Sequence, residues 1–132
     1  MDSLQVRTGQ VSLRILDDSG EERGIFKFNP QDVESAKKVF DAEAELEKTA
    51  AEFDKKAEAC QTPEEKIDLL NEAVTYYENM IDNIFGMGSS QVLFGTAKTL
   101  SMFEDFFQGI MPYYQKASDA RMSKYKRKSS GK

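Results

Sequence analysis

The chain has 132 residues, enough for one ordinary domain, with no His, no Trp and a single cysteine, Cys60. The lack of His excludes Ser–His and Cys–His nucleophiles, and one thiol cannot form an internal disulfide. The net charge of −5 is uneven, because residues 1–119 carry 12 Lys and Arg against 23 Asp and Glu, whereas residues 120–132 carry six cations and no acid. We therefore expect a single domain over residues 1–119 and a basic, disordered tail over residues 120–132.

Residues 10–28 have the pattern of a β-hairpin. Apolar and polar residues alternate over 11–15 and again over 24–28, as they do in half-buried strands. Between them lies a polar turn in which Gly20 can take positive φ. A further strand over 4–6 could join the pair. A two-stranded hairpin is marginal alone, so we expect it to pack on a helix or to mediate self-association through Val11, Leu13, Ile15, Phe26 and Phe28.

Two long helices are expected next, over about 30–60 and 63–85. Asn29 can cap the first helix, with Pro30 at its first helical position. Thr62 begins a capping box for the second helix. The second helix also carries the most regular apolar stripe in the chain, formed by Ile67, Leu70, Val74, Tyr77, Ile81 and Ile84. The short turn between the two helices predicts an antiparallel pair.

The last third of the chain is expected to be helical and rich in aromatic residues. Ser89 or Ser90 can cap a short helical turn, and a final helix should run over about 101–118, kinked or divided by Pro112. Its bulky residues form one wide face: Phe103, Phe106, Phe107, Ile110, Tyr113 and Tyr114. Such a face is usually core, but it could also be a groove or ridge that binds a partner chain, and both interpretations stay open.

Together these elements predict a mainly α fold with a small N-terminal β-hairpin (α+β), in which an antiparallel helical pair packs with a C-terminal aromatic helix. No constellation of residues indicates a catalytic, cofactor or metal site, so we expect a binding protein that is not an enzyme and needs no cofactor. Cys60 is interpreted as a small apolar residue near a helix end. No apolar run approaches the roughly 20 residues of a membrane span, and no secretory signal is evident, so we expect a cytoplasmic protein.

Two sequence motifs lie at the ends of predicted elements. The first ends the hairpin and is Phe26-Lys-Phe28-Asn29-Pro30-Gln-Asp32-Val33. The second ends the second long helix and is Ile81-Asp82-Asn-Ile84-Phe85-Gly86-Met-Gly88, followed by Leu93-Phe94-Gly95. With the aromatic helix and Lys-rich end, the chain over about 11–128 resembles the tail assembly chaperones of long-tailed, siphovirus-type bacteriophages of Gram-positive hosts. Met87 departs from the pattern, because that position is often acidic in relatives.

The resemblance implies a function in virus assembly. Such chaperones coat the long helical tape measure protein, keep it soluble and help recruit the major tail protein. They act in the host bacterial cytoplasm during infection and are absent from the mature virion. The resemblance also implies many copies for each tape measure protein, and hence a homo-oligomer.

Two other functions remain open from the sequence. The protein could be a structural minor tail or head–tail connector protein, which would be recovered from purified particles. It could also be a regulator that binds nucleic acid through the basic residues of 121–132, in which case its binding would weaken steeply with salt. The acidic body disfavours nucleic acid as a partner, so we do not expect it.

Overall fold

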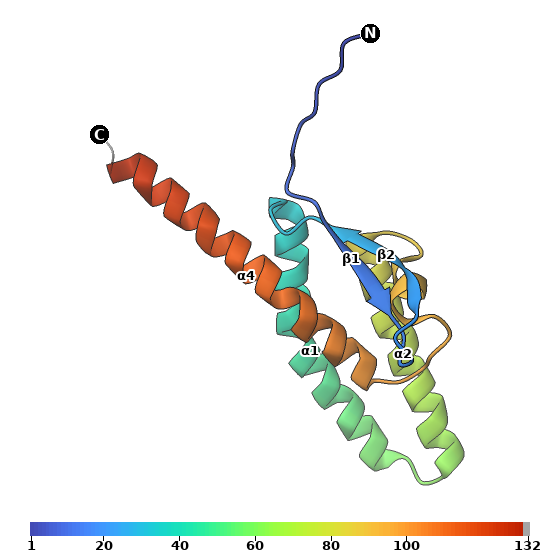
Figure 1. Cartoon of the computed structure of the whole chain (residues 1–132). Coiled ribbons are helices and arrows are strands. Elements are labelled where there is room, and N and C mark those ends of the chain that lie inside the picture. Colours follow the sequence, from blue (N-terminus) through green and yellow to red (C-terminus); the bar gives the residue numbers. More distant parts are fainter. Residues whose placement is uncertain (131–132) are drawn as a thin grey trace.

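The computed structural model describes residues 1–130, with side chains through Ser123. The chain is mainly helical and begins with a β-hairpin, which confirms the expected α+β class. Its elements, in chain order, are β1 (Val11–Leu16), β2 (Glu22–Phe28), α1 (Val33–Ala59), α2 (Pro63–Phe85), α3 (Ser89–Phe94) and α4 (Ser101–Ser130) (Figure 1).

The hairpin forms as its alternating pattern predicts. β1 and β2 pair antiparallel, with Leu13 opposite Phe26 and Val11 opposite Phe28. In the turn, the Asp17 carboxylate accepts hydrogen bonds from the backbone N–H groups of Ser19 and Glu21, each at 2.9 Å. Val11, Leu13, Ile15, Phe26 and Phe28 face the core, whereas Leu16 and Ile25 are exposed. The predicted strand over 4–6 is wrong, because residues 1–10 form no strand and the side chains there are exposed.

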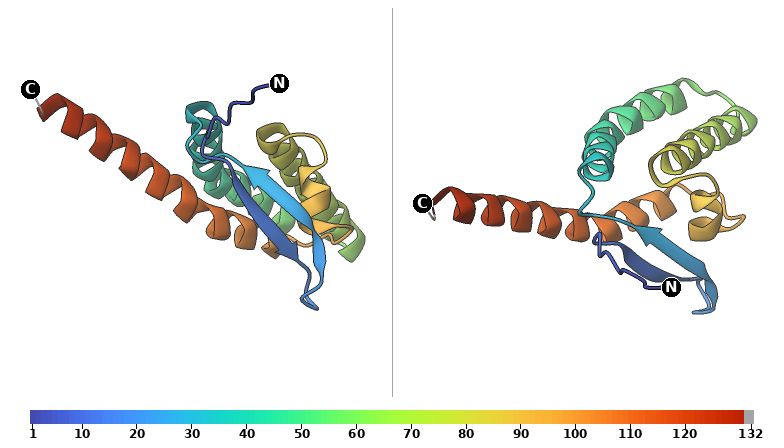
Figure 2. Two further views of the ribbon diagram at one scale, coloured as in Figure 1. Left: turned by 45° about the horizontal axis from the view of Figure 1, so that its top comes forward. Right: turned by 90° about the horizontal axis from the view of Figure 1, so that it is seen from above.

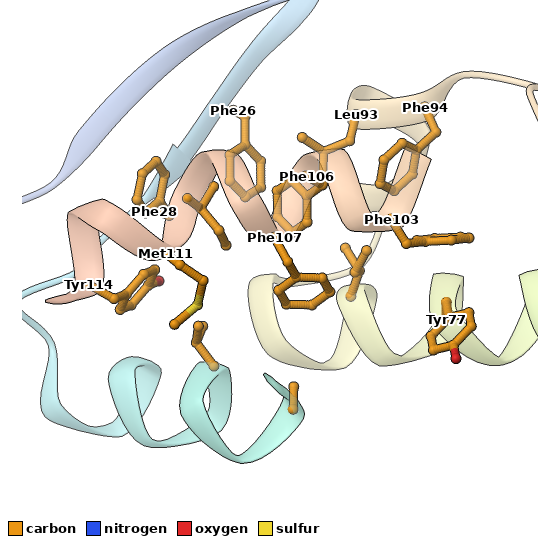
Figure 3. Packing of buried hydrophobic residues seen from close by; sticks show 14 of the residues in the cluster. Phe26, Phe28, Tyr77, Leu93, Phe94, Phe103, Phe106, Phe107, Met111 and Tyr114 are labelled. Atoms are coloured by element: carbon orange, nitrogen blue, oxygen red, sulfur yellow. The ribbon is translucent and has the colours of Figure 1, made fainter. Parts of the chain in front are cut away.

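α4 is the central element of the fold. Seen from above, the hairpin lies on one side of α4, while α1 and α2 lie on the other (Figure 2). Phe26 and Phe28 point from β2 onto α4, and Phe107 and Met111 point from the opposite side of α4 toward α1 and α2 (Figure 3). The core therefore has two apolar layers that share one helix, which explains why α4 is so rich in bulky residues.

α1 begins three residues later than the sequence predicts. Asp32 is its N-cap, and its carboxylate accepts from the N–H groups of Glu34 (2.9 Å) and Ser35 (3.1 Å). Asn29 instead closes a turn, because its side-chain oxygen accepts from Gln31 N at 3.0 Å, and its amide donates to the Thr8 carbonyl at 2.9 Å. An Asx turn competes with capping for the same side-chain oxygen, so the prediction of Asn29 as the cap is wrong.

α2 has the predicted bounds, and the predicted capping box is present. Thr62 Oγ1 accepts from Glu65 N at 3.1 Å, and the Glu65 carboxylate accepts from Gln61 N at 2.9 Å. α3 starts differently from the prediction, since its N-cap is Gly88, which makes no side-chain hydrogen bond. The Asp82 carboxylate at the end of α2 supplies the missing acceptor, by binding Ser90 N at 2.9 Å.

α4 is longer than predicted and continuous through Pro112. Pro112 is exposed, so the backbone carbonyl that it leaves unpaired lies on a face where water can bind it. The helix does not end near 118 but continues to Ser130, so the predicted end of the helix is wrong, whereas the disorder expected over residues 120–132 stays a prediction. No Pro or Gly interrupts 113–130, and the packed first half of α4 supplies the costly helix nucleus. Residues 131–132 lie outside the described residues.

Candidate interaction surfaces

The predicted aromatic face of α4 is almost entirely core. Phe103, Phe106, Phe107, Ile110 and Tyr114 are all buried. Phe106 packs edge-on against Phe26 and Phe85, with ring centroids 5.6 and 5.5 Å apart. Five of the six residues proposed to bind a partner are therefore occupied by contacts within the chain. Tyr113 is the exception, since it is 39% exposed at the rim of the core.

The hairpin residues predicted to mediate self-association also face the core. Phe26 and Phe28 are buried, and Val11, Leu13 and Ile15 are half-buried against the same cluster. Within residues 1–130 the sheet has two strands, so β1 pairs with β2 along one edge only. Self-association through the other edge of β1 stays a prediction, and it would use backbone groups rather than these side chains.

The structure shows a groove between α1 and α2 that the sequence analysis missed. It has a volume of about 500 Å³. Its apolar lining comes from Ala42, Tyr76, Met80 and Ile84, and its polar lining from Lys38, Asp41, Glu45, Asn79 and Asn83. The signal was present in the sequence, because Tyr76 and Met80 are four residues apart and lead to Ile84, the last residue of the main stripe, and so widen the apolar face of α2. A groove with an apolar floor and a polar rim suits an amphipathic helix.

A second cleft lies where the hairpin, α3 and the start of α4 meet. It has a volume of about 510 Å³. Asp18, Arg23 and Asp105 stand among its lining residues beside apolar Leu16, Phe94 and other core side chains. Its charges are of mixed sign, so they do not indicate one class of ligand.

Neither a metal cluster nor a membrane helix is found in the part of the chain that the structure describes. No group of three or more Cys, Asp or Glu side chains there could hold a metal ion. No helix among residues 1–130 is both long and apolar enough to cross a bilayer. Cys60 is partly exposed just after α1, and its thiol donates to the Lys56 carbonyl at 3.3 Å.

Two buried tyrosines make stability depend on alkaline pH. Burial raises the pKa of Tyr114, a hydrogen bond with Ser35 offsets part of this rise, and the Asp32 carboxylate adds to it. Burial also raises the pKa of Tyr77 above its usual 10.0, helped by nearby negative charges. A raised folded-state pKa means that the unfolded chain loses these protons first. Stability is therefore unaffected below about pH 10 and falls as pH rises further.

We expect the free energy of unfolding in urea to stay constant up to about pH 10 and to decrease as the pH rises further. The decrease should be smaller in Tyr114→Phe, because that variant lacks one of the two phenols. Urea titrations followed by circular dichroism at several pH values measure both slopes. Equal slopes for the two proteins would show that Tyr114 does not titrate differently in the folded chain.

The fold and its surfaces can now be set beside known proteins. A search of curated proteins finds no match, and neither does a search of solved structures. The model of one protein family, DUF6673, a family of unknown function, matches residues 22–132. That match covers β2, all four helices and both motifs of the sequence analysis. The chain therefore belongs to the DUF6673 family.

Proposed function

We propose that this protein is a tail assembly chaperone of a long-tailed bacteriophage. In this function it binds and solubilises the tape measure protein in the host cytoplasm, helps to recruit the major tail protein, and is absent from the mature virion. The observation that supports the proposal is the groove between α1 and α2, because its mixed apolar and polar lining suits an amphipathic helix of another protein.

The groove offers the two components that a helix-binding site needs. Ala42, Met80 and Ile84 supply apolar surface for the apolar stripe of an incoming helix. Asp41 and Glu45 on α1 can pair with cations on its flanks, and the amides of α2 can bind its polar side chains. A tape measure protein exposes many such apolar stripes before a tail tube encloses it, so repeated weak sites of this kind suit it.

The charge of α1 and α2 explains how binding would keep such a partner in solution. The two helices carry 14 Asp and Glu against six Lys. When the apolar stripe of the partner lies in the groove, the surface exposed to water is the acidic exterior of α1 and α2 instead of that stripe. A long helix coated with many copies would carry a large negative charge. Two such complexes would repel each other, which opposes aggregation.

The first experiment is co-expression with a candidate tape measure protein, followed by gel filtration of the soluble fraction. We expect the partner to become soluble and to co-elute with several copies of the chain. If the partner stays insoluble and the chain elutes alone, the proposal fails. If the chain is instead found in purified virions, it is a structural tail or connector protein.

A groove variant tests the site itself. Met80→Lys places a charge in the apolar part of the groove and should weaken co-elution by about tenfold or more. Ile25→Lys is the matched control, because Ile25 is 57% exposed on the outer face of the hairpin, far from the groove. Thermal unfolding of both variants separates a loss of binding from a loss of folding. Equal binding by both variants would place the site elsewhere.

A further inference from the structure

The main apolar stripe of α2 is covered along only part of its length. Val74 and Tyr77 are 2% and 7% exposed, whereas Leu70 and Ile67, earlier in the same stripe, are 50% and 64% exposed. All four residues recur at steps of three and four, so they share one face of the helix. The sequence pattern of a buried stripe therefore continues past the end of the core.

The start of α4 marks where the covering ends. Phe103, in the first turn of α4, packs on Tyr77 with ring centroids 5.2 Å apart. The pair of α1 and α2 extends well beyond that first turn (Figure 1). This end of α2 is acidic, with Glu64, Glu65, Asp68 and Glu72 against one cation of its own, Lys66, and with Glu72 paired to Lys56 of α1 at 3.8 Å. We call this the acidic end of α2, residues 63–73.

The other end of α4 has the opposite character. The C-terminal part of α4 projects away from the body of the molecule (Figures 1 and 2). Arg121 still contacts the body, because its guanidinium donates to the carbonyls of Pro30 (3.2 Å) and Gln31 (3.1 Å). One residue later, Met122 is 55% exposed. We call residues 116–130 the basic end of α4; they carry Lys116, Arg121, Lys124, Lys126, Arg127 and Lys128 against one acid, Asp119.

We propose that the basic end of α4 in one copy docks on the acidic end of α2 in a second copy. The opposite charges favour this pair, and Leu70 and Ile67 would gain apolar cover. The lengths agree, since 15 and 11 helical residues span about 22 and about 16 Å. The incoming helix would cover the part of the α2 stripe that lies next to the part covered by the chain's own α4. This proposal stands independently of the proposed function.

The geometry makes the contact intermolecular and head-to-tail. The two surfaces lie at opposite ends of the molecule, so a chain cannot bring its own pair together (Figure 1). Each copy offers one surface of each kind, which makes the contact heterologous. Such contacts propagate into an open chain of subunits or close into a ring. The assembly should therefore grow with concentration and shrink with salt, because salt screens exposed charges.

Sedimentation velocity of the full chain over a range of concentrations tests this proposal. We expect species larger than the monomer at low salt, and at least about tenfold weaker association at 1 M salt, where the screening length falls to about 3 Å. A monomer at every concentration and low salt would overturn the proposal. Binding of a DNA duplex by such a monomer would assign the basic end of α4 to nucleic acid instead.

Two complementary variants test the head-to-tail arrangement. One variant combines Ile67→Ser with Leu70→Ser, and the other combines Lys124→Glu, Lys126→Glu and Lys128→Glu. Each should be monomeric alone, yet an equimolar mixture should give dimers that cannot grow, since one intact surface of each kind remains. Leu16→Ser with Ile25→Ser is the control, because these residues are similarly exposed on the hairpin, and it should assemble like the unchanged chain. A mixture that stays monomeric, or single variants that assemble normally, would overturn the proposal.

Discussion

Replacing Tyr114 with alanine should lower the free energy of unfolding by about 4 kcal/mol, the largest effect that we expect from one substitution. Tyr114 is fully buried and stacks on Phe28 at 5.9 Å. Its ring also meets Phe40 edge-on at 6.5 Å, and its hydroxyl shares a hydrogen bond of 2.9 Å with Ser35 Oγ. One side chain of α4 thus joins the hairpin to α1, and its removal leaves a cavity between three elements.

Two controls separate the ring of Tyr114 from its hydroxyl and from its helix. Tyr114→Phe keeps the ring and removes one hydrogen bond, which should cost about 1 kcal/mol. Tyr113→Ala changes the neighbouring residue, which is 39% exposed, and should cost clearly less than Tyr114→Ala. Urea denaturation followed by circular dichroism measures all three. Equal losses for Tyr113→Ala and Tyr114→Ala would show that the junction of hairpin, α4 and α1 does not depend on this ring.

Local patterns in the sequence were sufficient for the hairpin and for α2. The alternation over 11–15 fixes which strand face is apolar, and the structure places those side chains against the core. The Thr62 capping box acts over four residues and needs no tertiary contact, so the start of α2 is predictable. Gly86, with a φ of +110°, ends the helix where a residue with Cβ would be strained.

The features that were mispredicted or left open depend on distant parts of the chain. The sequence alone allows Asn29 to cap a helix. In the structure its side-chain oxygen accepts from Gln31 N, and its amide donates to the carbonyl of Thr8, 21 residues away. The aromatic face of α4 could be core or surface until the hairpin and α2 covered it from two sides. The reverse holds for Leu70, whose pattern predicts burial although its side chain is 50% exposed.

The two motifs that carry the phage resemblance prove to be residues that build the fold. Phe26 and Phe28 anchor the hairpin, and Pro30 is buried in the turn that leads to α1. In the second motif, Asp82 caps α3, and Phe85 packs on Phe26 with centroids 5.2 Å apart. Residues that build a fold do not by themselves specify an activity, because function depends on sites placed on a fold. Of the residues that the two motifs specify, only Ile84 lines the groove. The proposed chaperone function therefore depends on tests of the groove itself.

The hairpin depends on its phenylalanines more than on its own pairing. Two strands alone are marginally stable in water, so the sheet persists because its inner face packs on α4. Phe28 is 5% exposed and contacts Tyr113 edge-on at 5.5 Å, while also stacking on Phe26 at 5.4 Å. We expect Phe28→Ala to lower the free energy of unfolding by about 3 kcal/mol, measured by urea denaturation.

The matched control is Ile25→Ala, three residues earlier on the same strand. Ile25 is 57% exposed on the outer face, so its loss should change the free energy of unfolding by about 0.5 kcal/mol or less. Amide hydrogen exchange adds a local measurement. In Phe28→Ala, the amides of β1 and β2 should exchange faster than those of α2, because the hairpin can then open without global unfolding. A loss near zero for Phe28→Ala, or uniform exchange, would mean that the hairpin is held by contacts other than its buried aromatic face.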